Sequence, residues 1–149
     1  MFARILVCVD GSPTGRKATV AAMEMAARFG CRLTLVSVLP STGGAPQPDL
    51  EKLVPADDEG HPVHRILEDA RSEALLKGVP TAEVVLLHGK VVESILEYVA
   101  RSTPDLVVVG TRGLSRGSRL LLGSVSSRLV NEAPCPVLVV RSVRGAKGS

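Results

Sequence analysis

The fold class is decided near the N-terminus by residues 4–39, which read RILVCVDGSPTGRKATVAAMEMAARFGCRLTLVSVL. Residues 4–9 form a short apolar run rich in β-branched side chains, which is typical of a strand buried on both faces. Ser12 and Pro13 supply a natural N-cap and first helical position, and the Ala- and Met-rich stretch that follows ends before Gly30. Residues 32–39 predict a second strand. The stretch therefore predicts a strand–helix–strand unit.

The rest of the chain continues this alternation of apolar runs and helical patterns. A Pro- and Gly-rich segment at 41–62, with an acidic cluster at 57–59, predicts a long surface loop. Further helices are expected at 63–77, 91–101 and 124–131, and further strands at 83–88, 106–109 and 137–140. Apolar strands that alternate with helices predict an α/β fold, with a parallel sheet covered by helices on both faces. We expect one domain over residues 1–141 and a basic tail at 142–149.

The overall composition excludes several classes of function. The 149 residues are 45% hydrophobic and 22% charged, with a formal net charge of +3, which is too small to indicate a nucleic-acid or membrane partner. One Tyr, two Phe and no Trp leave almost no aromatic platform for base stacking. Cys8, Cys31 and Cys135 lie far apart without zinc-ligand spacing, and Cys8 lies in an apolar run where a buried, inert thiol is expected. With no signal segment or membrane-length apolar run visible, we expect a reduced, cytoplasmic protein.

Candidate ligand-binding residues follow two of the predicted strands. Asp10 follows the first strand, and the segment GTRGLSRGSRLLLGS, residues 110–124, follows the fourth. Glycine lets backbone N–H groups approach a phosphate closely, and the helix that begins at Ser124 adds unpaired N–H groups and a partial positive charge. The alternative is that these glycines form tight turns, that Arg112, Arg116 and Arg119 are solvated, and that Asp10 only starts the first helix. The residues alone leave both interpretations open.

The glycine spacing favours the first interpretation. Gly110-x-x-Gly113, nine further residues and then Gly123-Ser124 resembles the G-2x-G-9x-G-(S/T) motif of ATP-binding universal stress proteins. The resemblance covers residues 4–141, including the Asp after the first strand, the loop after the second and the closing NEAPCPVLVV. It implies a three-layer, five-stranded sheet of order 3-2-1-4-5. The strand order then reverses between strands one and four, and open α/β sheets bind ligands at such a point.

The resemblance also implies roles for nine residues in binding the nucleotide. Asp10 and the backbone of Val38 would hold the adenine and ribose, and Gly110, Arg112 and Gly113 would line the ribose and first phosphate. Gly123, Ser124 and the amides of Val125 and Ser126 would bind the outer phosphates. Mg²⁺ would accompany the triphosphate and need no protein cage. The three histidines, His61, His64 and His88, share no spacing typical of a metal site.

The leading functional hypothesis is a stress-response or regulatory module that binds ATP, ADP or AMP. Two alternatives stay open: a slow ATPase or adenylyl-transferring relative, and an interaction subunit that holds no nucleotide. Against catalysis, the sequence contains no GxxxxGK[ST], HxGH or SGGxDS motif, and no obvious water-positioning residue near the glycines, so we expect slow hydrolysis at most. The resemblance further implies a homodimer that pairs through residues 136–141, an exposed apolar sheet edge.

Overall fold

The computed structural model describes residues 2–11, 13–39, 62–111 and 123–141, and these residues form an α/β fold. Its strands are β1 (Arg4–Cys8), β2 (Arg32–Leu39), β3 (Thr81–His88), β4 (Leu106–Gly110) and β5 (Val137–Val140). Its helices are α1 (Pro13–Phe29), α2 (Pro62–Leu76), α3 (Val91–Ser102) and α4 (Ser124–Glu132). The strands are parallel and lie in the order β3-β2-β1-β4-β5, which confirms the predicted fold class and strand order.

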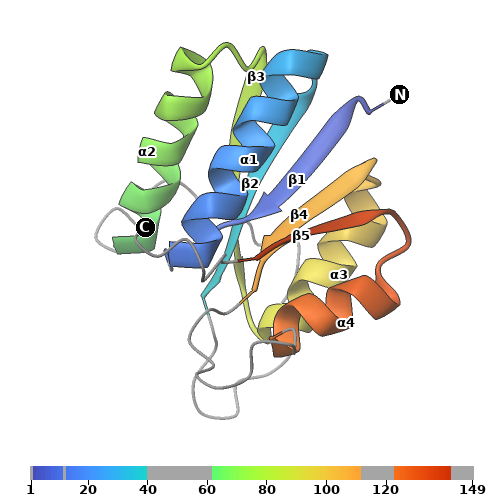
Figure 1. The fold of residues 1–149 in the computed structure, drawn as a ribbon. Helices are drawn as coiled ribbons and strands as arrows, with labels where there is room; N and C mark the ends of the chain where they lie inside the picture. Colours follow the sequence, from blue (N-terminus) through green and yellow to red (C-terminus); the bar gives the residue numbers. More distant parts are fainter. Residues whose placement is uncertain (1, 12, 40–61, 112–122, 142–149) are drawn as a thin grey trace.

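The sheet lies between two helical layers (Figure 1). α1 and α2 cover one face, whereas α3 and α4 cover the other. Alternate residues of β1 show why both faces must be covered, since Ile5 and Val7 belong to the α1–α2 core and Leu6 belongs to the α3–α4 core. All three side chains are at most 1% exposed. A strand buried on both faces must be apolar throughout, as the sequence of β1 is.

Where the element boundaries differ from the predicted ones, they differ by one or two residues. β3 begins at Thr81, two residues before the expected start, because it pairs with β2 from Arg32 onward. α2 begins at Pro62, which the sequence analysis placed in the preceding loop; proline suits a first helical position because it has no N–H to leave unpaired. The remainder of the predicted loop, Ser12 and the predicted tail at 142–149 lie outside the described residues.

The topology predicts a crevice at the carboxyl-terminal ends of the strands. β1 pairs with β2 on one side and with β4 on the other, and α1 and α4, the next helices after β1 and β4, lie on opposite faces of the sheet (Figure 1). The carboxyl ends of these two neighbouring strands carry Asp10 and Gly110. In open α/β sheets this is the position where ligands bind.

Candidate functional site

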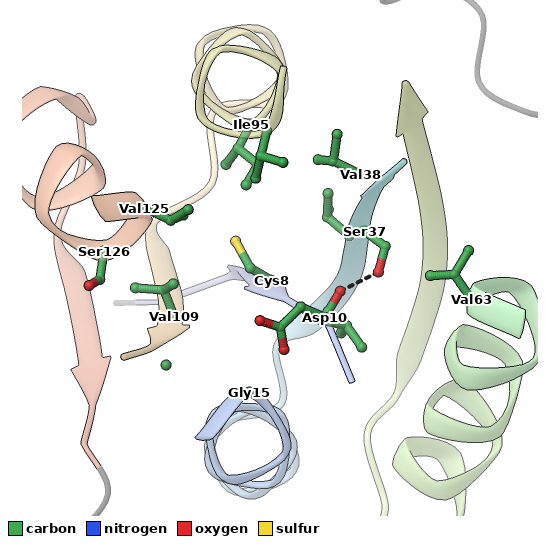
Figure 2. Close-up of a pocket in the computed structure, with 14 residues that line it drawn as sticks. Cys8, Asp10, Gly15, Ser37, Val38, Val63, Ile95, Val109, Val125 and Ser126 are labelled. Carbon is green, nitrogen blue, oxygen red and sulfur yellow. Dashed lines mark hydrogen bonds between the residues drawn. The ribbon is translucent and has the colours of Figure 1, made fainter. Parts of the chain in front are cut away.

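A cavity of about 250 Å³ lies at the carboxyl ends of β1, β2 and β4 (Figure 2). The three strands and the residues directly after them supply most of its wall, and residues near the beginnings of the four helices supply the rest. Its lining residues are Cys8, Val9, Asp10, Gly15, Val36, Ser37, Val38, Val63, Val91, Ile95, Val109, Gly110, Val125 and Ser126. The cavity therefore joins segments from all parts of the described chain.

All four helices point their N-termini at this cavity. Gly15 is the third residue of α1, Val63 the second of α2, Val91 the first of α3 and Val125 the second of α4, and each of them lines the cavity. The N-terminus of a helix carries about half a positive charge, because its first amides have no partner within the helix. Four such termini around one cavity make it a favourable place for an anion.

The first turn of α4 shows these donors most clearly. Gly123 is the N-cap, and the amide of Ser127 donates to its carbonyl over 2.9 Å. The amides of Ser124, Val125 and Ser126 precede that bond, so the helix offers them no acceptor. The Ser126 hydroxyl donates to the Gly123 carbonyl at 3.2 Å, which keeps the side chain turned back toward the N-cap. The backbone of this turn is thus arranged as a set of hydrogen-bond donors.

Much of the remaining wall is apolar. Its apolar lining residues include Val36 and Val38 from β2, Ile95 from α3 and Val109 from β4. The thiol of Cys8 also points into the cavity (Figure 2), and burial, helped by the charge of Asp10, raises its pKa to about 12. Cys8 therefore stays a neutral thiol near pH 7. The sequence predicted a buried side chain, whereas Cys8 is only partly buried because it lines the cavity. This wall suits a flat, weakly polar group.

Asp10 supplies a carboxylate at the mouth of the cavity (Figure 2). The residue is exposed and follows directly on the end of β1. Its place is fixed by the neighbouring backbone, because the Val9 amide donates to the Val36 carbonyl at 2.7 Å and the buried Ser37 hydroxyl donates to the Val9 carbonyl. A carboxylate held at this point can accept hydrogen bonds from hydroxyl groups of a ligand.

Gly110 has a packing role that the sequence analysis did not foresee. A Cβ at this position would lie 2.5 Å from the carbonyl oxygen of Thr14 and 3.0 Å from the amide nitrogen of Gly15. The end of β4 therefore lies directly against the backbone of the first turn of α1. The Thr14 hydroxyl donates to the carbonyl of Thr111 across the same contact. Glycine at position 110 brings β4 and α1 together, whether or not a ligand is bound.

An ionic cluster ties α4 to α3 beside the cavity. The Arg128 guanidinium lies 2.8 Å from Glu93 of α3 and 2.9 Å from Glu132 of its own helix. The hydrogen bonds from Arg128 lower the pKa of both carboxyl groups. These charges are exposed, so each pair contributes little stability, but together they favour one orientation of α4 relative to α3.

The structure places the nine predicted site residues as follows. Five of them line the cavity: Asp10, Val38, Gly110, Val125 and Ser126. Gly123 and Ser124 form the N-cap and first residue of α4, adjacent to the lining residues but not among them. Arg112 and Gly113 lie outside the described residues, as do Arg116 and Arg119.

Sequence reasoning missed most of the apolar wall and the contribution of the other helices. Gly15, Val63, Val91 and Ile95 carry no unusual chemistry, and each lies near the start of a helix. The available signal was positional, because every helix of such a fold begins at the edge where parallel strands end. Among the described residues no group of three His, Cys, Asp or Glu side chains could hold a metal ion. The same part of the chain contains no helix long and apolar enough to cross a membrane.

Comparison with known proteins supplies the family. The model of the Universal stress protein family matches residues 1–141. The chain belongs to the universal stress protein family. A Thermus aquaticus protein, the universal stress protein in the QAH/OAS sulfhydrylase 3′ region, is 38% identical over 143 residues, which are 95% of this chain and all of the relative. The family assignment agrees with the resemblance drawn from the glycine spacing.

Solved structures of universal stress proteins share the fold. One, crystallised in complex with cAMP, matches with a TM-score of 0.72 and 25% identity, covering 95% of this chain and 98% of that one. Another, from Archaeoglobus fulgidus in complex with dAMP, matches with a TM-score of 0.68 and 24% identity over 93% of this chain and 98% of that one. Members of this fold family have thus been crystallised with adenine nucleotides.

Proposed function

We propose that this universal stress protein binds an adenine nucleotide, with ATP as the principal ligand, and acts as a nucleotide-responsive module in a stress response. The observation that carries the proposal is the cavity in which four helix N-termini face an apolar wall, with the Asp10 carboxylate at the mouth. An adenine nucleotide has matching parts: an apolar ring, two ribose hydroxyls and a chain of phosphates. The likeness to a universal stress protein crystallised with cAMP supports the same class of ligand.

The parts of the nucleotide are assigned by the chemistry of the wall. The adenine lies among Val36, Val38 and Ile95, and Asp10 accepts hydrogen bonds from the ribose. At about 250 Å³ the cavity is near the lower end of the ~300–1,000 Å³ range of small-molecule sites, which suits a nucleoside. The phosphates then extend toward α4.

The proposed phosphate end of the site includes residues at the start of α4 and residues outside the described part of the chain. Gly123, Ser124, Val125 and Ser126 would present amides to the outer phosphates, and the proposed roles of Arg112 and Gly113, which lie outside the described residues, are at the ribose and first phosphate. ADP and AMP would use the same adenosine half of the site. Mg²⁺, if it accompanies ATP, would neutralise phosphate charge and be held mainly by the phosphates.

The arrangement favours binding over turnover. Among the described lining residues Asp10 is the only carboxylate, and it lies at the ribose end. Phosphoryl transfer needs a positioned water as well as charge neutralisation, and the α4 amides supply only the second. Interactions that hold the ground state and the transition state equally do not raise the rate. We therefore propose slow hydrolysis at most.

We also propose a homodimer that pairs through residues 136–141. β5 lies at an edge of the sheet, where Leu138 is 37% exposed, and Val130 of the neighbouring α4 is 46% exposed. Apolar side chains beside an unpaired strand edge favour association with a second chain. The three free cysteines fit the reducing cytoplasm that we propose as the location, with no nucleic-acid or membrane partner.

The test of nucleotide binding is the substitution Gly123→Val. Gly123 has φ −69° and ψ 168°, an extended conformation that any residue adopts, so valine strains no backbone there. Valine is a poorer N-cap than glycine, and melting without nucleotide measures that loss separately from the loss of ligand stabilisation. Asn131→Val is the matched control, since it adds the same side chain at an exposed position in the last turn of α4.

Thermal unfolding of the three proteins is measured with ATP, AMP, cAMP and, for comparison, GTP. Wild type and Asn131→Val should be stabilised by about 2.7 kcal/mol at 100 times the dissociation constant of ATP, and Gly123→Val by clearly less. Wild-type protein that shows no shift with any adenine nucleotide would contradict the proposed function. Equal shifts in wild type and Gly123→Val would contradict the phosphate position alone.

A further inference from the structure

A second cavity, of about 290 Å³, lies at the opposite edge of the sheet from the first. It opens on the α3 side, at the amino ends of β1 and β2 and beneath the last turn of α3. Its charged lining residues are Arg4, Arg32, Glu83 and Arg101. None of them belongs to the proposed nucleotide site.

The strand register gathers these side chains on one face. Arg4 of β1 is the Cα partner of Arg32 of β2, and Thr34 is the partner of Glu83 of β3. Side chains two residues apart on a strand point to the same side, and Leu6, two residues after Arg4, packs in the α3–α4 core. The two arginines thus lie next to each other below α3.

The helix completes the cavity from above. Arg101 and the half-buried Tyr98, one turn apart in α3, both line it. Arg101 is exposed, and its side chain forms no hydrogen bond or ion pair within the part of the chain that the structure describes. Its planar guanidinium is therefore available to a ligand and can offer two parallel N–H donors to an oxyanion.

The charge balance of the cavity is positive. Three guanidinium groups face one carboxylate, Glu83, whose distance of 3.7 Å to Arg32 makes a loose pair. The nearby Asp105 does not line the cavity, because its Oδ2 accepts the amides of Ala3 and Arg4 at 2.7 and 2.8 Å.

The C-terminus of α3 carries about half a negative charge, which opposes an anion. Arg4 neutralises part of this negative charge, because its guanidinium donates to the carbonyl of Ser102 at 3.1 Å. A lining charge of about +2 is thus larger than the partial charge of the helix end.

We propose that this cavity is a second binding site, for a small organic molecule that carries a phosphate or carboxylate group. Arg101 binds the oxyanion with a pair of hydrogen bonds, Arg32 and Arg4 add positive charge, and the ring of Tyr98 packs on the carbon skeleton. The proposal does not rest on nucleotide binding at the other edge of the sheet.

Tyr98 makes the site directly observable. It is the only tyrosine of the chain, which has no tryptophan, so tyrosine fluorescence and absorbance report on this cavity alone. Burial and the neighbouring Glu83 raise the pKa of Tyr98, and Arg101 opposes that rise. A bound anion should therefore raise this pKa further, because it disfavours a second negative charge.

The experiment is a titration of the full chain followed by Tyr98 fluorescence. The probes are inorganic phosphate, glycerol 3-phosphate and citrate, each at constant ionic strength with sodium chloride as the control. The variants are Arg101→Gln, Arg101→Lys and, as a matched control on α2, the exposed Arg65→Gln. Gly123→Val tests whether any response comes from the nucleotide site. Melting curves establish that every variant is folded.

We expect saturable binding of at least one organic probe, about tenfold weaker in Arg101→Gln, intermediate in Arg101→Lys and unchanged in Arg65→Gln and Gly123→Val. Inorganic phosphate that binds as well as glycerol 3-phosphate would contradict the role given to the carbon skeleton. The whole proposal is overturned if sodium chloride reproduces the signal, if no probe saturates, or if Arg101→Gln titrates like wild type.

Discussion

Replacing Gly110 with alanine should destabilise the fold, even with no ligand present. The added Cβ would lie 2.5 Å from the Thr14 carbonyl oxygen and 2.7 Å from its carbonyl carbon, against 3.4 Å or more for ordinary contact. Both groups are backbone, so β4 and α1 must separate by nearly 1 Å, and the hydrogen bond from Thr14 to Thr111 is strained. Overpacking in a tight interior costs roughly 1–3 kcal/mol, and we expect the upper end here because no flexible side chain can move away.

The expected loss can be converted into a melting temperature. An unfolding entropy of about 2.1 cal/mol/K per residue gives about 0.3 kcal/mol/K for 149 residues, so a loss of 3 kcal/mol lowers Tm by about 10 °C. Urea unfolding at one protein concentration, followed by circular dichroism, gives the free energy directly. Nucleotide binding should weaken as well, since the contact also positions Gly15 at the cavity.

Gly30→Ala is the matched control, because it adds the same methyl group at a position where the cost comes from backbone strain and not from a steric clash. The built Cβ has no heavy atom within 4 Å, but φ is +69°, so alanine must adopt a left-handed conformation at a cost of about 1 kcal/mol. Gly110→Ala should therefore be the more destabilised of the two. A Gly110→Ala protein within 1 kcal/mol of wild type, or one more stable than Gly30→Ala, would refute the packing argument.

Three further predictions follow from the edge strand, the nucleotide site and an ion pair. Light scattering at micromolar concentration with ATP should show a dimer, and Leu138→Glu should shift it toward monomer; a monomeric wild type would contradict the proposed interface. Phosphate release should stay below about one turnover per second, and faster release that disappears in Gly123→Val would make the protein an ATPase. The hydrogen bond from Arg16 over 2.7 Å lowers the pKa of Glu73 below 4.5, so the stability it adds is present above that pH and is lost as pH falls through the lowered pKa. Arg16→Met should therefore lose up to about 1 kcal/mol at pH 7 and almost nothing at a pH well below the lowered pKa of Glu73, whereas an equal loss at both would show that the charge is irrelevant.

The fold could be predicted because its strongest signals are local. Each strand is a short apolar run, each helix has its own periodicity, and Gly30 marks the end of α1 with a positive φ of 69°. Strand order is different, since any two of these apolar strands can pair equally well through their backbones. The strand order was predicted from the family resemblance, and the strand pairing in the structure confirms it.

The candidate site divides in the same way. The sequence by itself singled out Asp10 and the glycines as candidate site residues, because a glycine or an aspartate after a strand is recognisable without knowing its neighbours. Only the tertiary structure brought the beginnings of α1, α2 and α3 to the same cavity, and their residues are ordinary valine, isoleucine and glycine. It also gave Gly110 its packing role, and it placed Arg101 of α3 in one cavity with Arg4 and Arg32. Such juxtapositions depend on distances between segments far apart in the chain, and a local pattern carries no information about those distances.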